Sequence, residues 1–319
     1  MKVGIAGAAG YTAGELIRIL IHHPHAELKY IQSESHKGEA VCKVHRDLLC
    51  SPLIFSDIDF SDIDVLFLCM GHGASSGFLS THDIPEQVKI IDLSNDFRLQ
   101  KDSGGFVYGL PELFRETIKG SSHIANPGCF ATAIELGLLP IASINRLPEE
   151  ITVFGITGST GAGQKPSEET HFSNRNNNLS NYKVFTHQHL DEIHETLAKA
   201  GARNFHDMAF VPVRGCHSRG IFINTVLRTD ISPERMTALY KEYYDTHPFT
   251  VVSDEPLYLK QAVNTNYCYI NICRHGRQVL VTSVIDNLLK GASGQAVQNM
   301  NLMSGLEETE GLHLKAVCF

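Results

Sequence analysis

Short apolar runs alternate with helical patterns through the first half of the chain, and this alternation restricts the possible folds more than any other feature. Residues 2–6 (KVGIA) form the first run, a turn with two glycines follows, and residues 12–24 place leucine and isoleucine at helical spacing. Further apolar runs occupy residues 26–33, 64–71, 89–94 and 122–126. Strands that alternate with helices build βαβ units, so the pattern predicts an α/β fold with a parallel sheet of the Rossmann type.

The second half of the chain has a different sequence pattern. After residue 150, β-branched and glycine-rich runs predominate, and only residues 190–201 and 232–247 have clear helical patterns before the helical tail. We therefore expect a strand-rich α+β domain over residues 129–286, which would carry catalysis and substrate binding. The first domain would cover residues 1–128, and residues 287–319 would return to it as a C-terminal helix.

Composition excludes several classes of function. The formal net charge of −8 disfavours general binding to nucleic acid or to anionic membranes. No apolar run reaches the roughly 18 residues of a membrane span, and the N-terminus lacks a signal-peptide pattern. The eight cysteines have no framework spacing, so we expect reduced thiols in a cytoplasmic protein.

The turn after the first strand has the position of a nucleotide-binding loop. Gly7 and Gly10 would permit a tight turn and let a pyrophosphate approach N–H groups at a helix N-terminus, although a turn without a ligand would look similar. After the second strand, Ser33, Ser35 and Lys37 favour NADP over NAD. Glu34 would favour NAD if its side chain turned inward.

One cysteine has the placement of a nucleophile. Cys129 follows an Asn-Pro-Gly turn and precedes a helical run, and a helix N-terminus lowers the pKa of a thiol. A buried structural cysteine is the alternative interpretation. His187 and His189 are candidate bases for this thiol, and His217 is another. The histidine pair lacks a third ligand at a recognisable spacing, so no metal site is predicted.

A second glycine-rich loop follows a strand in the second half. Ser159 and Gly161 lie in this loop, GSTGAG at 158–163, whose backbone N–H groups could bind an oxyanion or a phosphate. A flexible connector is the alternative. Downstream, Asn287 and Gly291 link the last apolar run to the C-terminal helix.

Together these segments resemble the N-acetyl-γ-glutamyl-phosphate reductases of arginine biosynthesis. The resemblance covers nearly the whole chain and rests on seven blocks in the family's order: GAAGYTAGEL (7–16), IDLSNDFRL (91–99), YGLPEL (108–113), NPGCFAT (126–132), GSTGAG (158–163), HQHLDEI (187–193) and DNLLKGASGQAVQNMN (286–301). It implies a Rossmann domain and an α+β domain similar to those of aspartate-semialdehyde dehydrogenase and glyceraldehyde-3-phosphate dehydrogenase. It also implies a homodimer or homotetramer.

The resemblance implies a reaction and assigns roles to residues. The reaction is NADPH-dependent reduction of N-acyl-γ-glutamyl phosphate, a small-molecule acyl phosphate, to the 5-semialdehyde and phosphate through a cysteine thioester. The positions that match are Cys129 as the nucleophile, His189 or His187 as the acid/base, Gly7, Gly10, Tyr11 and Thr12 in the nucleotide loop, and Asn287 beside the nicotinamide. The alternatives are another semialdehyde dehydrogenase, such as that for aspartate semialdehyde, or a non-catalytic NADP-binding regulator.

The chain departs from the family pattern at positions near the expected substrate. Phe130 and Ala131 replace Tyr-Pro after the cysteine, Gln164 replaces the arginine that usually ends the glycine loop, and Val213 replaces a frequent histidine. The candidate substrate contacts are Ser159, Gly161, Arg175 and Arg219. Arg175 lies in an unusually polar segment, so it could pair with an extra carboxylate, as in an N-succinyl substrate.

Overall fold

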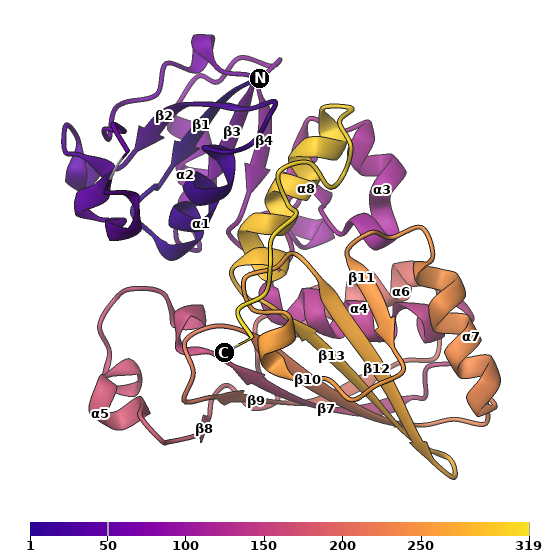
Figure 1. The fold of residues 1–319 in the computed structure, drawn as a ribbon. Coiled ribbons are helices and arrows are strands. Elements are labelled where there is room, and N and C mark those ends of the chain that lie inside the picture. Colours follow the sequence, from indigo (N-terminus) through magenta and orange to yellow (C-terminus); the bar gives the residue numbers. More distant parts are fainter. Residues whose placement is uncertain (50, 319) are drawn as a thin grey trace. The chain divides into compact units, whose positions relative to one another are not determined.

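The computed structural model describes residues 1–49 and 51–318, which form two compact units (Figure 1). Of the described residues, the first unit comprises 1–49, 51–127 and 292–313, and the second comprises 128–291 and 314–318. Gly128 and residues 287–291 and 314–318, which were predicted to belong to the first domain, lie in the second unit.

The first unit is built around a parallel sheet in the order β2-β1-β3-β4-β6-β5. Its strands are β1 (Lys2–Ala6), β2 (Glu27–Gln32), β3 (Val65–Leu68), β4 (Lys89–Asp92), β5 (Val107–Tyr108) and β6 (His123–Ala125). Its helices are α1 (Tyr11–Leu20), α2 (Ala74–Thr81), α3 (Pro111–Lys119) and α8 (Gly294–Met303). The predicted Rossmann-type sheet is confirmed, and the strand order reverses between β1 and β3, where such sheets bind ligands.

Two helices of the first unit show why its sequence folds in this way. α1 buries Leu16, Ile17 and Leu20 on one face, as its apolar spacing predicts. All ten residues of α8 are buried, including four amide side chains. Asn299, for example, donates from Nδ2 to the carbonyl oxygen of Gly109 at 2.9 Å. This bond compensates the burial of the Asn299 amide nitrogen and helps to fix the helix in position.

The second unit contains a mixed sheet in the order β11-β12-β13-β10-β7-β9-β8. Its strands are β7 (Glu150–Thr157), β8 (Ser180–Asn181), β9 (Asp207–Arg214), β10 (Ile221–Arg228), β11 (Thr250–Ser253), β12 (Cys268–His275) and β13 (Gln278–Ile285). Its helices are α4 (Cys129–Ser143), α5 (Phe172–Arg175), α6 (Leu190–Ala200) and α7 (Pro233–Tyr244), and a π-helical turn, Leu289–Ser293, follows β13. The predicted α+β architecture is confirmed.

The two faces of the mixed sheet differ in burial. α4 packs against β10, β12 and β13, and α6 and α7 pack against α4. Side chains that face these helices, such as Val153 and Ile223, are fully buried. On the opposite face Phe154 and Val226 are 49% and 43% exposed. This face therefore presents apolar side chains to solvent in a single chain.

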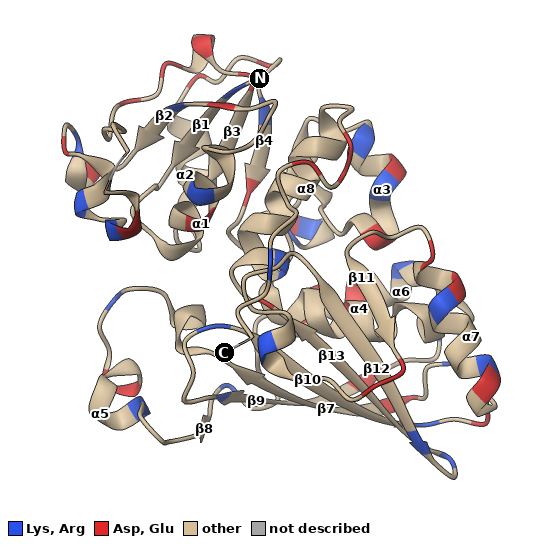
Figure 2. Ribbon diagram, viewed as in Figure 1, with Lys and Arg blue, Asp and Glu red and all other residues tan. Residues whose placement is uncertain are grey.

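Acidic and basic residues are interspersed along α3 and along α7, as the coloured ribbon of Figure 2 shows. Within the described residues, no helix combines the length and the apolar character needed to cross a membrane.

Candidate active site

Cys129 is the first residue of α4. The preceding Gly128 is the N-cap, with extended backbone angles (φ −68°, ψ 149°), and the Cys129 side chain is partly exposed. The N–H groups in the first turn of any α-helix lack carbonyl partners within the helix and point toward its N-terminus. The sulfur therefore lies where both the helix dipole and these N–H groups stabilise a thiolate.

A buried histidine and a buried glutamate lie against the turn that carries Cys129. His189, the N-cap residue of α6, places Nε2 3.7 Å from Oε1 of Glu192, and Glu192 Oε2 accepts a hydrogen bond from the Gly128 N–H at 3.1 Å. A Cβ on Gly128 would lie 2.5 Å from His189 Nε2, so only glycine allows this approach. The structure thus brings a predicted base and the predicted nucleophile to one place.

His187 lies beside His189 but in a different environment. The two ring centroids are 4.6 Å apart, and His187 Nδ1 accepts a hydrogen bond from the His189 backbone N–H at 3.2 Å. Burial, with a smaller effect of the Lys183 charge, lowers the pKa of His187 to about 4. His187 is therefore neutral at pH 7. In the described part of the chain, no group of three or more His, Cys, Asp or Glu residues is arranged to hold a metal ion.

Tyr182 extends the site from the histidines toward β9. Its ring centroid lies 5.8 Å from that of His187, and the guanidinium carbon of Arg214 lies 4.5 Å from its ring centroid. Burial raises the pKa of Tyr182, and the charge of the Cys129 thiolate raises it further. Arg175 follows, because its Nη1 donates to the carbonyl oxygen of Arg214 at 3.1 Å and to Ser180 Oγ at 3.2 Å.

The glycine loop at 158–163 is held by its own hydrogen bonds. The Ser159 N–H donates to the carbonyl oxygen of His217 at 2.9 Å, and the Gly161 N–H donates to that of Gly158 at 3.3 Å. Both N–H groups are therefore already donated within the chain in this structure. The loop resembles a braced connector, and the first turn of α4 is the better source of donors.

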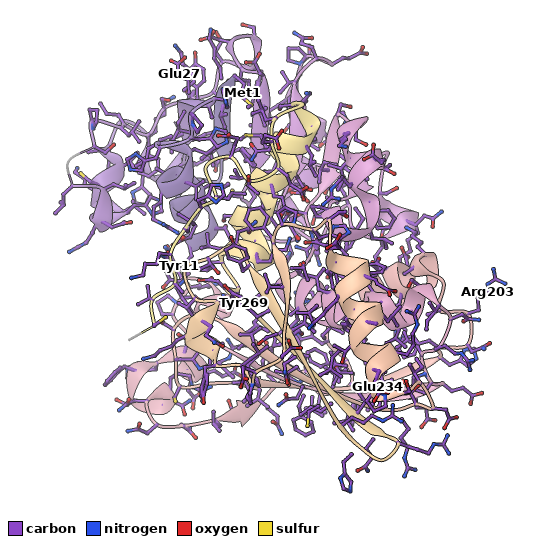
Figure 3. The ribbon with its side chains drawn as sticks, turned by 45° about the vertical axis from the view of Figure 1, so that its right-hand side comes forward. Met1, Tyr11, Glu27, Arg203, Glu234 and Tyr269 are labelled. Carbon is purple, nitrogen blue, oxygen red and sulfur yellow. The ribbon has the colours of Figure 1, made fainter. Side chains whose placement is uncertain are left out.

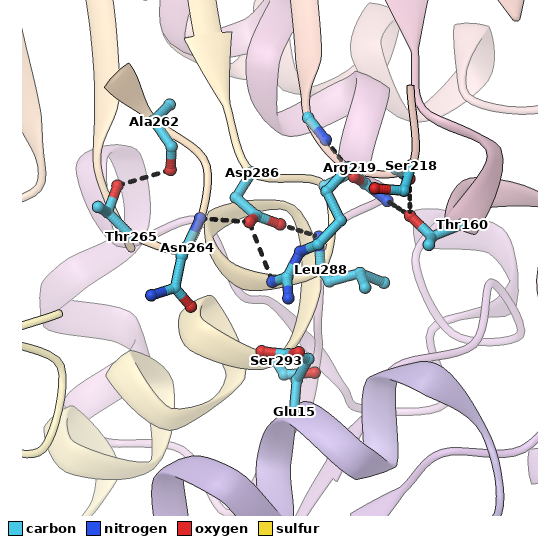
Figure 4. A network of polar contacts seen from close by, with 12 residues as sticks. Glu15, Thr160, Ser218, Arg219, Ala262, Asn264, Thr265, Asp286, Leu288 and Ser293 are labelled. Carbon is cyan, nitrogen blue, oxygen red and sulfur yellow. Dashed lines mark hydrogen bonds and ion pairs between the residues drawn. The ribbon is translucent and has the colours of Figure 1, made fainter. Parts of the chain in front are cut away.

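Arg219 belongs to a polar network with Asp286 and Asn264 at the end of β13 (Figure 4), and Asn287 is hydrogen bonded close by. Arg219 Nη2 lies 2.9 Å from Asp286 Oδ2, an oxygen that also accepts a hydrogen bond from the Asn264 N–H at 2.7 Å. Asn287 donates to Thr160 Oγ1 at 3.0 Å and accepts from the Gly220 N–H at 2.7 Å. Asp286 thus balances the charge of Arg219, and the amide of Asn287 is already hydrogen bonded.

His217, the other candidate base, lies in the loop after β9. Its Nε2 is 3.3 Å from the carbonyl oxygen of Gly220, and burial lowers its pKa. Residue chemistry alone does not distinguish this histidine from the pair at 187 and 189, and only the family resemblance favours the pair.

The predicted nucleotide loop lies at the carboxyl end of β1 in the first unit. Gly7 has φ +76°, and a Cβ there would lie 2.7 Å from Cγ of Met70, so the turn requires glycine. A Cβ on Gly10 would have no atom within 4 Å, which leaves the approach to α1 open to a ligand. Tyr11 begins α1 with an exposed side chain (Figure 3). The Thr12 carbonyl accepts from Ser293 Oγ at 2.7 Å. This geometry fits a pyrophosphate at the start of α1.

The residues after β2 lie where a nucleotide ribose would be recognised. Ser33 Oγ is 3.4 Å from Ser35 Oγ, and Glu34 begins a short 3₁₀ turn with its side chain exposed. Lys37 forms an ion pair with Asp57 on the surface. The two hydroxyls therefore adjoin the sheet, while the acid that would favour NAD points to solvent.

Sequence reasoning missed three residues that adjoin the cysteine turn. Glu192 could have been found, because it follows His189 at the i+3 spacing of a helix. Tyr182 gave no signal in a polar, irregular segment. Gly291 is also close, since a Cβ on it would lie 2.7 Å from the Cys129 Cβ. Its proximity depends on the π-helical turn at 289–293, which has no sequence pattern.

The fold and the cysteine-histidine site define a nicotinamide-dependent semialdehyde dehydrogenase. Residues 2–121 match the family of the semialdehyde dehydrogenase NAD binding domain, and residues 129–287 match that of the semialdehyde dehydrogenase dimerisation domain. Aspartate semialdehyde dehydrogenase II from Vibrio cholerae, solved with ASA, has the same fold (TM-score 0.73, 16% identity, 95% of this chain and 98% of that one). Aspartate semialdehyde dehydrogenase from Candida albicans, solved with NADP, is also similar in fold (TM-score 0.71, 13% identity, 95% of this chain and 98% of that one).

The more specific relatives match over the full length. Proteins named N-acetyl-gamma-glutamyl-phosphate reductase are 52% identical in Parabacteroides distasonis and 50% identical in Bacteroides fragilis, and each alignment covers 100% of both chains. The protein of that name from Flavobacterium johnsoniae is 48% identical over 99% of this chain and 98% of its own. The chain belongs to the N-acetyl-gamma-glutamyl-phosphate reductase family.

Proposed function

We propose that the protein reduces an N-acyl-γ-glutamyl phosphate to the corresponding 5-semialdehyde and phosphate, as a step of arginine biosynthesis. The observation that carries the proposal is the placement of Cys129 at the N-terminus of α4, against the buried His189–Glu192 pair. The names of full-length relatives support it. The reaction needs a nucleophile that forms a reducible acyl intermediate, and a thiolate forms a thioester.

In the proposed mechanism, the Cys129 thiolate attacks the acyl carbon, and the bond from that carbon to the phosphate oxygen breaks. N–H groups in the first turn of α4 stabilise the oxyanion of the tetrahedral intermediate. Phosphate leaves, and the acyl group remains on the sulfur as a thioester. After reduction the thiohemiacetal collapses, which releases the aldehyde and regenerates the thiolate.

In this proposal His189, rather than His187, supplies the proton that the oxygen of the reduced intermediate takes up, and accepts it back when the thiohemiacetal collapses. Glu192 stabilises the protonated imidazole of His189, and both groups are buried beside the cysteine turn. His187 has a pKa of about 4, so its imidazole ring is uncharged at neutral pH. Its hydrogen bond from the His189 N–H instead holds the start of α6 in place.

The nicotinamide cofactor, which supplies hydride when bound, is NADP in this proposal. Gly7, Gly10, Tyr11 and Thr12 would hold its pyrophosphate at α1. Ser33 and Ser35 would donate to a 2′-phosphate, and Glu34 points to solvent. Asn287 would lie on the nicotinamide side, as the family resemblance implies. We also propose a cytoplasmic location and a homodimer or homotetramer.

The test is NADPH oxidation with N-acetyl-γ-glutamyl phosphate, in wild type and Cys129→Ser. We expect loss of at least about a thousandfold in kcat/KM in the variant, because serine is not ionised and an ester is not reduced in this way. NADPH binding, measured by its fluorescence, should be unchanged. Cys273→Ser, a change at an exposed thiol on β12, is the control.

Retained activity in Cys129→Ser would contradict the assignment of the nucleophile. Wild-type activity with aspartyl phosphate but not with N-acetyl-γ-glutamyl phosphate would identify the protein as another semialdehyde dehydrogenase. NADPH binding with no turnover of either compound would indicate a regulator. The same assay with NADH measures the cofactor preference directly.

A further inference from the structure

Two buried arginines of the second unit have no acidic partner. Arg175 and Arg214 are 6% and 7% exposed, and among residues 1–49 and 51–318 neither forms an ion pair with Asp or Glu. Arg175 Nε and Arg214 Nη1 have no hydrogen-bond acceptor in the same part of the chain. Arg219, by contrast, is balanced by Asp286.

Such an arrangement is costly unless a ligand completes it. A guanidinium group does not deprotonate in a protein, so burial cannot be relieved by a loss of charge. The cost of burying unpaired charge is several kcal/mol for each ion in general. The free N–H groups of guanidinium match the oxygens of a carboxylate, with two parallel hydrogen bonds. The pair therefore has the chemistry of an oxyanion site.

The two arginines are placed by the edge of the mixed sheet. Arg214 ends β9, paired with Thr157 on β7 and with Ser180 on the edge strand β8. Arg175 ends α5, and its hydrogen bonds to Ser180 and to the Arg214 carbonyl join α5 to this edge (Figure 1). Both side chains thus adjoin the carboxyl end of β9.

Contacts lead from this edge to the reacting sulfur. Arg214 lies over the ring of Tyr182, Tyr182 contacts His187, and His187 contacts His189 beside the cysteine turn. A chain of side-chain contacts therefore joins the arginines to the turn that carries the cysteine. A substrate bound through its reacting carbon at Cys129 would reach the arginines with a distant group.

We propose that Arg175 and Arg214 bind a carboxylate at the far end of the substrate's N-acyl group, so that the preferred acyl group is dicarboxylic, such as succinyl. This inference rests on the proposed function. The phosphate is attached to the reacting carbon, and it leaves at Cys129. The acyl group is the end of the substrate farthest from that carbon, which suits two cations beyond Tyr182. An acetyl group has no charge to pair with them.

The first experiment compares kcat/KM for N-succinyl- and N-acetyl-γ-glutamyl phosphate with NADPH. We expect the wild type to prefer the succinyl compound by at least about tenfold. Arg175→Gln and Arg214→Gln should each lower kcat/KM for the succinyl compound by about 30-fold or more, because each leaves a carboxylate with one charged partner. Activity with the acetyl compound should change less than about threefold. Arg203→Gln, a change at an exposed arginine of the same unit, is the matched control (Figure 3).

A second measurement does not depend on turnover or on the variants. Calorimetric binding of N-succinylglutamate and N-acetylglutamate to the wild type should show tighter binding of the succinyl compound. A wild-type preference for the acetyl compound, or equal binding of the two, would overturn the inference. Equal losses for both substrates in the arginine variants would overturn it too, because the arginines would then bind the α-carboxylate or phosphate. If neither phosphate is reduced, the proposed function fails, whereas the binding comparison still decides the role of the arginines.

Discussion

At the residue scale, the site contains two neighbouring histidines with different proton chemistry. His189 faces a carboxylate, with Nε2 3.7 Å from Oε1 of Glu192. His187 is enclosed by the rings of Phe130, Tyr182 and Phe210, which offer no charge to an imidazolium. The alternation of residue types along the chain cannot reveal this difference, because both histidines are equally buried, at 6% exposure.

The depressed pKa of His187 predicts a pH dependence of stability. The folded-state pKa of about 4 lies below the value of about 6.5 for the unfolded chain, so between these pH values the unfolded chain binds more protons. The free energy of unfolding should therefore fall as the pH decreases from 6.5 to 4, by about 3 kcal/mol from this residue. Above about pH 6.5 this residue causes no loss of stability, since it is neutral in both the folded and the unfolded state.

Urea unfolding of wild type and His187→Asn at several pH values measures this contribution. Asparagine offers an oxygen in place of Nδ1, so the hydrogen bond from the His189 N–H can persist. The variant should lose stability less steeply below pH 6.5 than the wild type. Other histidines with lowered pKa, such as the half-buried His123, contribute equally to both proteins and cancel. Identical pH dependence in the two proteins would show that His187 is not held neutral.

The sequence revealed part of the site at this scale, and the reason is physical. Cys129 could be predicted because helix N-termini have local signals and local electrostatics. Arg214 and Tyr182 could not, because their contact joins a strand end to an irregular segment more than thirty residues earlier. Gly128 is an intermediate case, since its turn was foreseen but its close approach to His189 required the tertiary structure.

At the element scale, α4 shows how the structure compensates for a local irregularity. Pro140 lies within this helix, and proline has no N–H to donate to the carbonyl four residues earlier, that of Leu136. The hydroxyl of Tyr244 in α7 donates to that same carbonyl. Tyr240, also in α7, donates to the carbonyl of Gly137 at 2.6 Å. Tyr244 therefore supplies the donor that the Leu136 carbonyl lacks because of the proline. Together the two tyrosines attach α7 to α4.

This arrangement predicts a coupling between Pro140 and Tyr244. Tyr244→Phe should lower the free energy of unfolding by about 1–3 kcal/mol, because a buried carbonyl loses its donor. In a Pro140→Ala background the helix regains an N–H at residue 140, so the same change should cost less. A double-mutant cycle by urea unfolding measures the difference. Additive effects of the two changes would mean that Tyr244 acts through packing alone.

Most helices and strands could be predicted from the sequence, and the exceptions are segments without hydrophobic periodicity. α1, α6 and α7 follow apolar spacings of 3.6, and β7 and β10 follow alternation, so the sequence located them. The short β8 and α5 carry no such periodicity, because each is held by contacts with β9 rather than by burial of its own face. The candidate carboxylate site lies in this non-periodic part.

At the scale of the whole molecule, the open face of the mixed sheet makes a prediction about assembly. Phe154 on β7 lies directly across from Asn224 on β10, and Val226 follows on the same face. Exposed apolar side chains gathered on a sheet face are typical of an interface. The match of residues 129–287 to a dimerisation domain family is consistent with a second copy of the chain on this face. We therefore expect the molecular mass in solution to be two or four times the 35.2 kDa of one chain.

Charges placed on this face should separate the copies. Phe154→Lys and Val226→Glu would each bury an unpaired charge in the interface, so light scattering after size-exclusion chromatography should show at least a twofold fall in mass. Val317→Glu, a change at another exposed valine of the second unit, should leave the mass unchanged. A wild type that elutes as a monomer, or variants that keep the wild-type mass, would contradict the assignment. A monomeric variant that still binds NADPH would also show that assembly is separate from cofactor binding.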